Sequence, residues 1–392
     1  MDNRLGLILT GGGARAAYQV GVLKAIAEFL PRRAPNPFPV ICGTSAGALN
    51  AAALAINAQN FRHGVRYLDN IWKHFHANQV YRTDAPGVLK NTSLWMAGLL
   101  LSGLGINKLK HISLLDNSPL VKFLEAVVPC EKIQNSIDAG LLHALSITAS
   151  GYGSGQSVSF YQGVGEIIPW RRARRIGVPT KIEIKHLLAS AALPFFFPAY
   201  LINREHFGDG SMRQIAPISS ALHLGATRIL VIGVTTNPAQ LHRINMSDYP
   251  SLAQIAGHAL NGLFLDNMEI DLERVQRINK LAAMLSASAR TEADIRHVDI
   301  LVISPSQPIE KIAEHHANEL PWTIRLLLRL VGAMQHSGST LVSYLLSEGK
   351  YCRALINLGY QDAALRREEI LSFIGGQPGM TANHSGQKND SH

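Results

Sequence analysis

The chain has 392 residues, of which 47% are hydrophobic and 17% charged, so it has enough apolar material for a core and is not a disordered or low-complexity protein. Its cysteines (Cys42, Cys130 and Cys352) are odd in number and scattered, which excludes a disulfide framework and a zinc-ligand pattern and favours a reducing compartment. A formal net charge of +9 raises the attraction for polyanions, either anionic lipid or nucleic acid.

The N-terminal region predicts a parallel β-α-β unit. Residues 5–10 are a short apolar run typical of a buried parallel strand. Apolar positions between 16 and 30 recur at alternating steps of four and three, which is one face of a helix, and the prolines of 31–37 end it. A second strand at 40–42 then leads into an alanine-rich helix at 46–58. Such a unit is right-handed.

The rest of the chain predicts further strands and a helical C-terminal part. Residues 145–150 and 158–162 read as a hairpin around a glycine-rich loop. Further strands are expected at 228–234 and 300–303, and helices over 252–285 and 320–346. We therefore expect an α/β domain over 1–250, a mainly helical extension over 251–374 that packs on it or continues it, and a disordered tail over 375–392.

The first glycine-rich turn, Gly11-Gly12-Gly13, lies between the first strand and its helix. Glycines there let the backbone approach a ligand, and a helix N-terminus offers free N–H groups to an anion. The spacing also satisfies a dinucleotide fingerprint, which requires an acidic residue at the end of the next strand. That strand runs into Gly43 instead, so a nucleotide site is disfavoured, and a purely structural tight turn remains an alternative.

A second turn, Gly43-Thr44-Ser45-Ala46-Gly47, has the G-x-S-x-G pattern between a strand and a helix. That context is typical of a nucleophile elbow, in which small neighbours hold an exposed serine hydroxyl. The alternative is an ordinary helix N-cap at Ser45. Because the first turn follows a neighbouring parallel strand, its N–H groups are expected near Ser45, as an oxyanion hole requires.

A nucleophilic serine needs a base, and Asp209 is the candidate. Ser45 comes too early in the chain for the α/β-hydrolase order of strands, and His206 reads equally well as a surface residue. Asp209 stands between Gly208 and Gly210 after an apolar stretch, so burial is expected to raise its pKa and make it a better base. The alternative is an aspartate in a reverse turn.

Together these motifs, with residues 189–194 and Ala216-Pro217, resemble the patatin-like phospholipase family over about residues 5–235. The resemblance implies a three-layer α/β/α fold with a mostly parallel central sheet, and hydrolysis of lipid acyl esters by a Ser–Asp dyad with no cofactor or metal. Ala16 and Ser211 depart from the family pattern without removing a reacting group. The resemblance implies the following roles: nucleophile Ser45, base Asp209, oxyanion amides of Gly11, Gly12 and Gly13, and loop support by Arg15, Gly43, Gly47 and Gly210.

Three segments are candidates for contact with lipid. Residues 91–107 carry no charge and are flanked by lysines, which fits a lid or interfacial segment, with a buried core helix as the alternative. Residues 320–334 are apolar except for two arginines, and fit either an interfacial helix or ordinary packing. The arginine cluster at 170–175 suits phosphate headgroups or a solvated loop, and it is weak evidence for nucleic acid.

The sequence thus predicts a serine acyl hydrolase, similar to a phospholipase A or lysophospholipase, in lipid catabolism or membrane remodelling. No signal peptide or spanning helix is expected, so we predict a cytoplasmic enzyme that rests on an anionic membrane face and does not bind nucleic acid. Two alternatives stay open: a non-catalytic lipid-binding or regulatory protein with the same fold, and a nucleotide-dependent enzyme that uses the glycine-rich loop.

Overall fold

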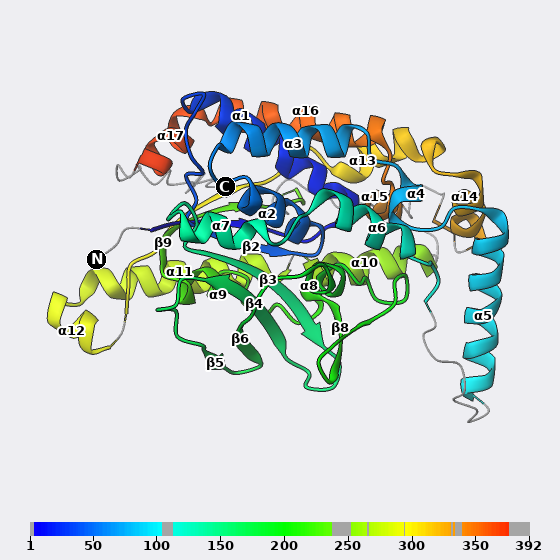
Figure 1. The fold of residues 1–392 in the computed structure, drawn as a ribbon, viewed down its shortest axis with the longest axis horizontal. Coiled ribbons are helices and arrows are strands. Elements are labelled where there is room, and N and C mark those ends of the chain that lie inside the picture. Colours follow the sequence, from blue (N-terminus) through cyan, green and yellow to red (C-terminus); the bar gives the residue numbers. More distant parts are fainter. Residues whose placement is uncertain are drawn as a thin grey trace, which may run out of the picture.

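The computed structural model describes residues 4–103, 113–236, 252–264, 266–293, 295–330, 332–333 and 339–375. In this part of the chain a single mixed sheet lies between two layers of helices (Figure 1). The expected α/β class with a three-layer arrangement is confirmed. The expected tail and residues 104–107 of the candidate lid lie outside the described residues, apart from Gly375, which ends the last helix.

The parallel half of the sheet has the order β10-β9-β1-β2-β3. Its strands are β1 (Arg4–Leu9), β2 (Val40–Thr44), β3 (Ala144–Gly151), β9 (Ala226–Ile232) and β10 (Asp299–Ile303). The predicted strands near 5, 40, 145, 228 and 300 are therefore confirmed. All five strands point the same way, so their carboxyl ends meet at one edge, where ligands bind in open α/β sheets.

The other half of the sheet is largely antiparallel. β4 (Ser157–Gly163) forms the predicted hairpin with β3, and β6 (Arg175–Pro179) and β5 (Arg171–Arg172) follow at the edge. β8 (Glu205–Asp209) also pairs antiparallel with β3, and β7 (Tyr200–Ile202) pairs with β8. This branch carries the end of β8 to the carboxyl end of β3.

Alternating burial along the strands explains the three layers. Leu7 and Leu9 of β1 belong to a core on one face of the sheet, and Ile8 between them belongs to a core on the other. Successive side chains of a strand point to opposite faces, so both faces of this apolar sheet need a cover. The first face is covered by α1 (Ala17–Phe29), α2 (Ala46–Ile56), α3 (Phe61–Lys73), α7 (Lys132–Asp138), α13 (Ile309–His316), α15 (Ser339–Leu345), α16 (Gly349–Leu365) and α17 (Arg367–Gly375), and the second by α9 (Ser219–His223) and α11 (Asp266–Met284).

The remaining helices lie at the rim and ends of the molecule. They are α4 (Ala77–Val80), α5 (Ala85–Gly103), α6 (Ser118–Val127), α8 (Ile184–Ser190), α10 (Leu252–Phe264), α12 (Ala287–Glu292) and α14 (Trp322–Leu330), with short 3-10 turns η1 (Gly13–Ala16), η2 (Gly210–Met212) and η4 (Ala317–Glu319). Helix α5 projects from the body beside α14 (Figure 1).

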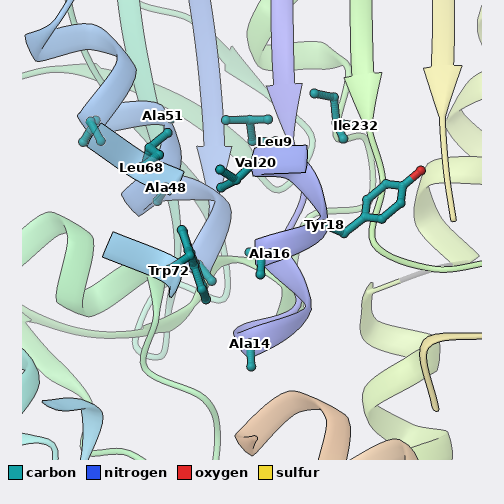
Figure 2. Close-up of a cluster of buried hydrophobic side chains, with 14 of the residues drawn as sticks. Leu9, Ala14, Ala16, Tyr18, Val20, Ala48, Ala51, Leu68, Trp72 and Ile232 are labelled. Atoms are coloured by element: carbon teal, nitrogen blue, oxygen red, sulfur yellow. The ribbon is translucent and has the colours of Figure 1, made fainter. Parts of the chain in front are cut away.

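The larger core joins the first and last parts of the chain. Figure 2 shows side chains of this core from β1 (Leu9), α1 (Val20), α2 (Ala48), α3 (Trp72) and β9 (Ile232). Small residues on α2, such as Ala48, let this helix lie close to the sheet and to α3. The elbow that starts α2 is thereby fixed between the sheet and the helical layer.

The C-terminal helices pack tightly on the N-terminal ones. Tyr18 of α1 donates a 2.9 Å hydrogen bond from its hydroxyl to Asp362 of α16. A Cβ at Gly21 would overlap the carbonyl oxygen of Ile356, and one at Gly359 would overlap the carbonyl oxygen of Tyr18. Since β10 also belongs to the central sheet, we propose that residues after 251 fold as part of the catalytic domain. The boundary at residue 250 stays a prediction.

Candidate active site

Ser45 occupies a sharp turn between β2 and α2. Its backbone has φ 54° and ψ −130°, a conformation that is costly for a residue with a side chain. The turn needs glycine on both sides: a Cβ at Gly43 would lie 2.6 Å from the Cα of Ala48, and one at Gly47 would lie 2.6 Å from the carbonyl oxygen of Thr10. The local sequence therefore builds the strained elbow that the G-x-S-x-G pattern predicts.

The hydroxyl of Ser45 points at a carboxylate and does not cap the helix. Ser45 stands at the N-cap position of α2, as the alternative expected, but its side chain makes no capping hydrogen bond to the helix. Its Oγ donates a 2.6 Å hydrogen bond to Oδ2 of Asp209, and both residues are buried, with exposed fractions of 4% and 1%. A short, desolvated contact of this kind is the geometry for direct proton transfer from hydroxyl to carboxylate.

Asp209 reaches Ser45 because β8 runs antiparallel to β3, with Asp209 paired to Ala149. Its second oxygen, Oδ1, accepts a 2.9 Å bond from the backbone N–H of Ser211, as the reverse-turn interpretation expects, while Oδ2 faces Ser45. A Cβ at Gly210 would overlap the carbonyl oxygen of Thr148, which makes glycine necessary here. Burial raises the pKa of the Asp209 carboxyl to about 6, and the hydrogen bonds from Ser45 and Ser211 only partly oppose that rise.

Ser190, for which the sequence suggested no role, positions the elbow. Its Oγ accepts a 2.8 Å hydrogen bond from the backbone N–H of Ser45 and donates a 2.6 Å bond to the carbonyl oxygen of Thr148. The side chain is fully buried at the end of α8. It therefore ties the turn after β2 to strand β3. Residues 189–194 carried the family resemblance, but nothing in their pattern indicated this contact.

The glycine-rich loop lies beside Ser45 but its three residues differ in position. Gly13, with φ +55°, lines the same cavity as Ser45. Gly11 lines a separate cavity of about 10 Å³, together with Thr44 and Ser211. In the described part of the chain no hydrogen bond is donated by the backbone amides of Gly11, Gly12 or Gly13. These amides can therefore donate to a ligand oxygen, and Gly13 is the one at the wall of the Ser45 cavity.

The cavity at Ser45 is about 60 Å³ and mostly apolar. Its walls come from α2, α3, α4, α6, the segment after α8, and the end of α15. Aromatic side chains form part of them, and the rings of Trp72 and Phe75 lie tilted against each other by 58° with centroids 5.0 Å apart. An apolar lining with few polar groups suits a hydrocarbon chain. The lining residues besides Gly13 and Ser45 are Ala14, Ala46, Leu49, Trp72, Phe75, Val80, Tyr81, Leu120, Ala191, Leu193, Phe197, Tyr344, Leu345 and Ser347.

Arg15 is fully buried directly after the glycine loop. Its guanidinium forms a 2.8 Å ion pair with Glu310 of α13 and donates a 2.8 Å hydrogen bond to Oγ of Ser343 in α15. It also lies over the ring of Tyr344, 4.1 Å from its centroid. Sequence reasoning expected Arg15 to support the loop but had no signal for these partners, because they follow it by some 300 residues and belong to helices that the motifs do not cover.

The other candidate groups lie outside this arrangement. His206 is an exposed residue of β8, and the arginines of the 170–175 cluster that are exposed lie on the β5–β6 edge of the sheet. Within the described residues, no group of three histidine, cysteine, aspartate or glutamate side chains is close enough to hold a metal ion. The groups that converge are thus a hydroxyl, a desolvated carboxylate, a glycine loop and an apolar cavity, a set that is chemically suited to acyl transfer.

The chain belongs to the patatin-like phospholipase family, because the model of that family matches residues 7–222. Among curated proteins it is similar to a cGAMP-activated phospholipase from Pseudomonas aeruginosa (strain BWHPSA011 / Pa011), with 25% identity over 240 residues. That match covers 59% of this chain and 62% of the relative, so the chain spans less than two thirds of the relative's length. Among solved structures it matches VipD from Legionella pneumophila with 16% identity and a TM-score of 0.31, over 67% of this chain and 55% of that one.

Proposed function

We propose that the protein is a serine acyl hydrolase that cleaves acyl esters of lipids, in the manner of a phospholipase A or lysophospholipase. The observation that carries the proposal is the 2.6 Å hydrogen bond from Ser45 Oγ to buried Asp209, beside an apolar cavity. Membership of the phospholipase family and the similarity to a curated phospholipase support the lipid substrate class.

In the proposed reaction Asp209 removes the proton from Ser45 as Oγ attacks the ester carbonyl carbon. The carbonyl oxygen becomes an oxyanion, and the amides of the glycine loop, Gly13 first, donate to it. Asp209 then passes the proton to the departing alcohol, which leaves an acyl-enzyme with its chain in the apolar cavity. A water molecule then gives a proton to Asp209 as its oxygen attacks the acyl carbon, and Asp209 returns that proton to Ser45 Oγ as the bond between Oγ and the acyl carbon breaks, which releases the fatty acid and restores Ser45.

Covalent labelling tests the nucleophile. We expect a fluorophosphonate probe to label the wild-type protein and Ser45→Ala to abolish labelling, because only an activated hydroxyl attacks the phosphorus. Ser347→Ala is the matched control, since Ser347 is a buried serine of the same cavity. In the described part of the chain its hydroxyl donates no hydrogen bond to a carboxylate. We expect this variant to label normally, and Asp209→Asn to fold but lose about 10²-fold or more in turnover.

A panel of phospholipids, lysophospholipids, acylglycerols and acyl thioesters identifies the substrate. Release of fatty acid from one class supports the proposal and names the headgroup. A folded protein that takes no label and is inert on the whole panel favours the non-catalytic lipid-binding alternative. Binding of ATP or NAD(P), measured by calorimetry, favours the nucleotide-dependent alternative.

We also propose that the protein rests on an anionic membrane through α5 and α14. Leu94 and Met96 of α5 are 43% and 52% exposed, and Trp322 and Leu326 of α14 are 62% and 52% exposed. The buried core helix considered for residues 91–107 is therefore wrong for the described residues up to Met96. The hydroxyl of Thr323 donates a 2.7 Å bond to the carbonyl oxygen of Thr83, which joins α14 to the segment just before α5.

The position of α5 relates this apolar surface to the site. Val80 and Tyr81, just before α5, line the Ser45 cavity, and so does Leu120, in the helix that follows. Nearby cations, Lys90 and Arg329, are exposed and suit anionic headgroups. None of the described helices is both long and apolar enough to cross a bilayer. The expected cytoplasmic location stays a prediction.

A further inference from the structure

We infer that helices α13 and α15 are part of the catalytic machinery, because they position the glycine loop through Arg15, and that Glu310 is a positioning residue for the reaction. The inference rests on the proposed acyl hydrolase function. It concerns residues beyond 222, where the match to the family model ends.

The guanidinium of Arg15 is held by C-terminal groups on several sides. Besides the ion pair with Glu310 and the bond to Ser343, its terminal nitrogen lies 3.4 Å from the carbonyl oxygen of Thr340, and Tyr344 covers one face. The Arg15 side chain has no exposed surface. Burying a cation is costly unless its charge is paired, so the place of Arg15 depends on this set of partners.

Helix α15 also touches the loop backbone directly. A Cβ at Gly13 would overlap the carbonyl oxygen of Tyr344, so this carbonyl packs against the loop residue that lines the Ser45 cavity. Tyr344, Leu345 and Ser347 themselves line that cavity. One end of α15 therefore contacts the glycine loop, anchors Arg15 and forms a cavity wall. A shift of α13 or α15 would move the amides that are proposed to hold the oxyanion.

Glu310 is the charged member of this set that supplies the counter-ion. Among the described residues, Arg15 Nη1 is buried without a hydrogen-bond partner. The negative charge opposite the guanidinium comes from the Glu310 carboxylate, which pairs with Nη2. Glu310 keeps 26% of its side chain exposed, and it lies on α13, outside the cavity that holds Ser45. It acts on the reaction through Arg15 and does not touch the substrate. Its removal is expected to alter the oxyanion loop and leave acyl binding intact.

The test compares Glu310→Ala, Glu310→Gln and the control Lys311→Ala, an exposed neighbour on the same helix. Each is titrated with the fluorophosphonate probe, so that turnover is expressed per labelled site and any unfolded fraction is discounted. We expect Glu310→Ala to lower kcat per site about tenfold with KM within about twofold of wild type. The reason is that misplaced loop amides stabilise the oxyanion of the transition state less well, while the apolar cavity that binds the acyl chain is unchanged. Glu310→Gln, which keeps an acceptor for Arg15, is expected to recover part of that loss.

The outcomes separate this inference from the proposed function. Unchanged kcat per labelled site in both Glu310 variants overturns the inference while the hydrolase assignment stands. A change confined to the number of labelled sites, with kcat per site at the wild-type value, assigns Glu310 a purely structural role and also overturns it. Wild-type protein that takes no label and hydrolyses no ester overturns the proposed function, and with it the inference. If Glu310→Ala does not fold, Glu310→Gln alone decides the matter by the same measurement.

Discussion

At the scale of single residues, the proposed site depends on a carboxylate, that of Asp209, which is buried away from water. Asp209 is 1% exposed and accepts short hydrogen bonds from the hydroxyl of Ser45 and the backbone N–H of Ser211. An exposed aspartate would be ionised far below neutral pH and would be a weak base. Burial disfavours the charged form, raises the pKa to about 6 and brings it closer to the pH at which a general base is most effective.

The raised pKa predicts how activity depends on pH. Asp209 accepts the serine proton only when it is ionised, so we expect kcat/KM on a soluble short-chain ester to rise about tenfold per pH unit below about pH 6 and to level off above it. A pH–rate profile between pH 4 and 8 measures this acid limb. A midpoint near 4 would contradict the desolvated carboxylate. Asp209→Asn is the control, because its residual activity is expected to lack the limb.

At the residue scale, the glycine turns were predictable from the sequence. Glycines at 43, 47 and 210 are required by contacts with backbone only a few residues away or on a neighbouring strand, and such turns leave a clear pattern in the sequence. The role of Ser190 was not predictable. A serine at the end of a helix has many ordinary explanations, and only the packing of α8 against β3 shows that its hydroxyl meets the N–H of Ser45.

At the scale of elements, the close contact of α1 and α16 fixes how the C-terminal helices sit. Gly21 and Gly359 let the two backbones approach until each faces a carbonyl group of the other helix. This contact, with the Tyr18–Asp362 hydrogen bond, holds α16 against the first helix after the glycine loop. Because α15 directly precedes α16, its place beside Gly13 depends on the same packing.

The packing predicts the effect of one added methyl group. Gly359→Ala would place a Cβ against the carbonyl group of Tyr18, so α16 must move away from α1, and we expect a loss of about 1–3 kcal/mol in unfolding free energy. Urea unfolding followed by circular dichroism measures it. Gly165→Ala is the control, since nothing lies within 4 Å of its Cβ, and it is expected to leave stability unchanged within about 0.5 kcal/mol. Equal stability of the two variants would show that the helices are not in close contact.

At the scale of the whole molecule, α5 and α14 lie near each other at one end (Figure 1), and both helices carry exposed apolar side chains. A lipid substrate resides in a bilayer, and an enzyme that acts there gains from a surface that enters the headgroup layer. The proposed membrane surface has exposed apolar side chains, which suit that layer, and cations near them, which suit anionic headgroups. The cavity and the exposed apolar side chains are therefore formed by neighbouring segments of the chain.

This arrangement predicts a separation between vesicle binding and chemistry. We expect Trp322→Asp to weaken sedimentation with phosphatidylglycerol vesicles about tenfold, because a large apolar side chain is lost from the interface, and to leave hydrolysis of a soluble short-chain ester unchanged. Met284→Asp is the matched control, because Met284 is 82% exposed on α11 in a different part of the molecule. If both variants bind vesicles like the wild type, α14 is not a membrane contact.

The sequence by itself predicted that the first two strands are parallel neighbours and that each ends in a glycine turn, because such turns need backbone geometry that only particular residues permit. That Ser45 and Asp209 act as a pair is a prediction from the family resemblance. Only the tertiary structure decided what surrounds them. Trp72 and Phe75 form an aromatic wall of the cavity beside Ser45, and Glu310 forms an ion pair with Arg15. Both arrangements bring together segments that are far apart in the chain. Their side chains are ordinary in sequence, and they gain a function only when α3, α13 and α15 pack around the elbow.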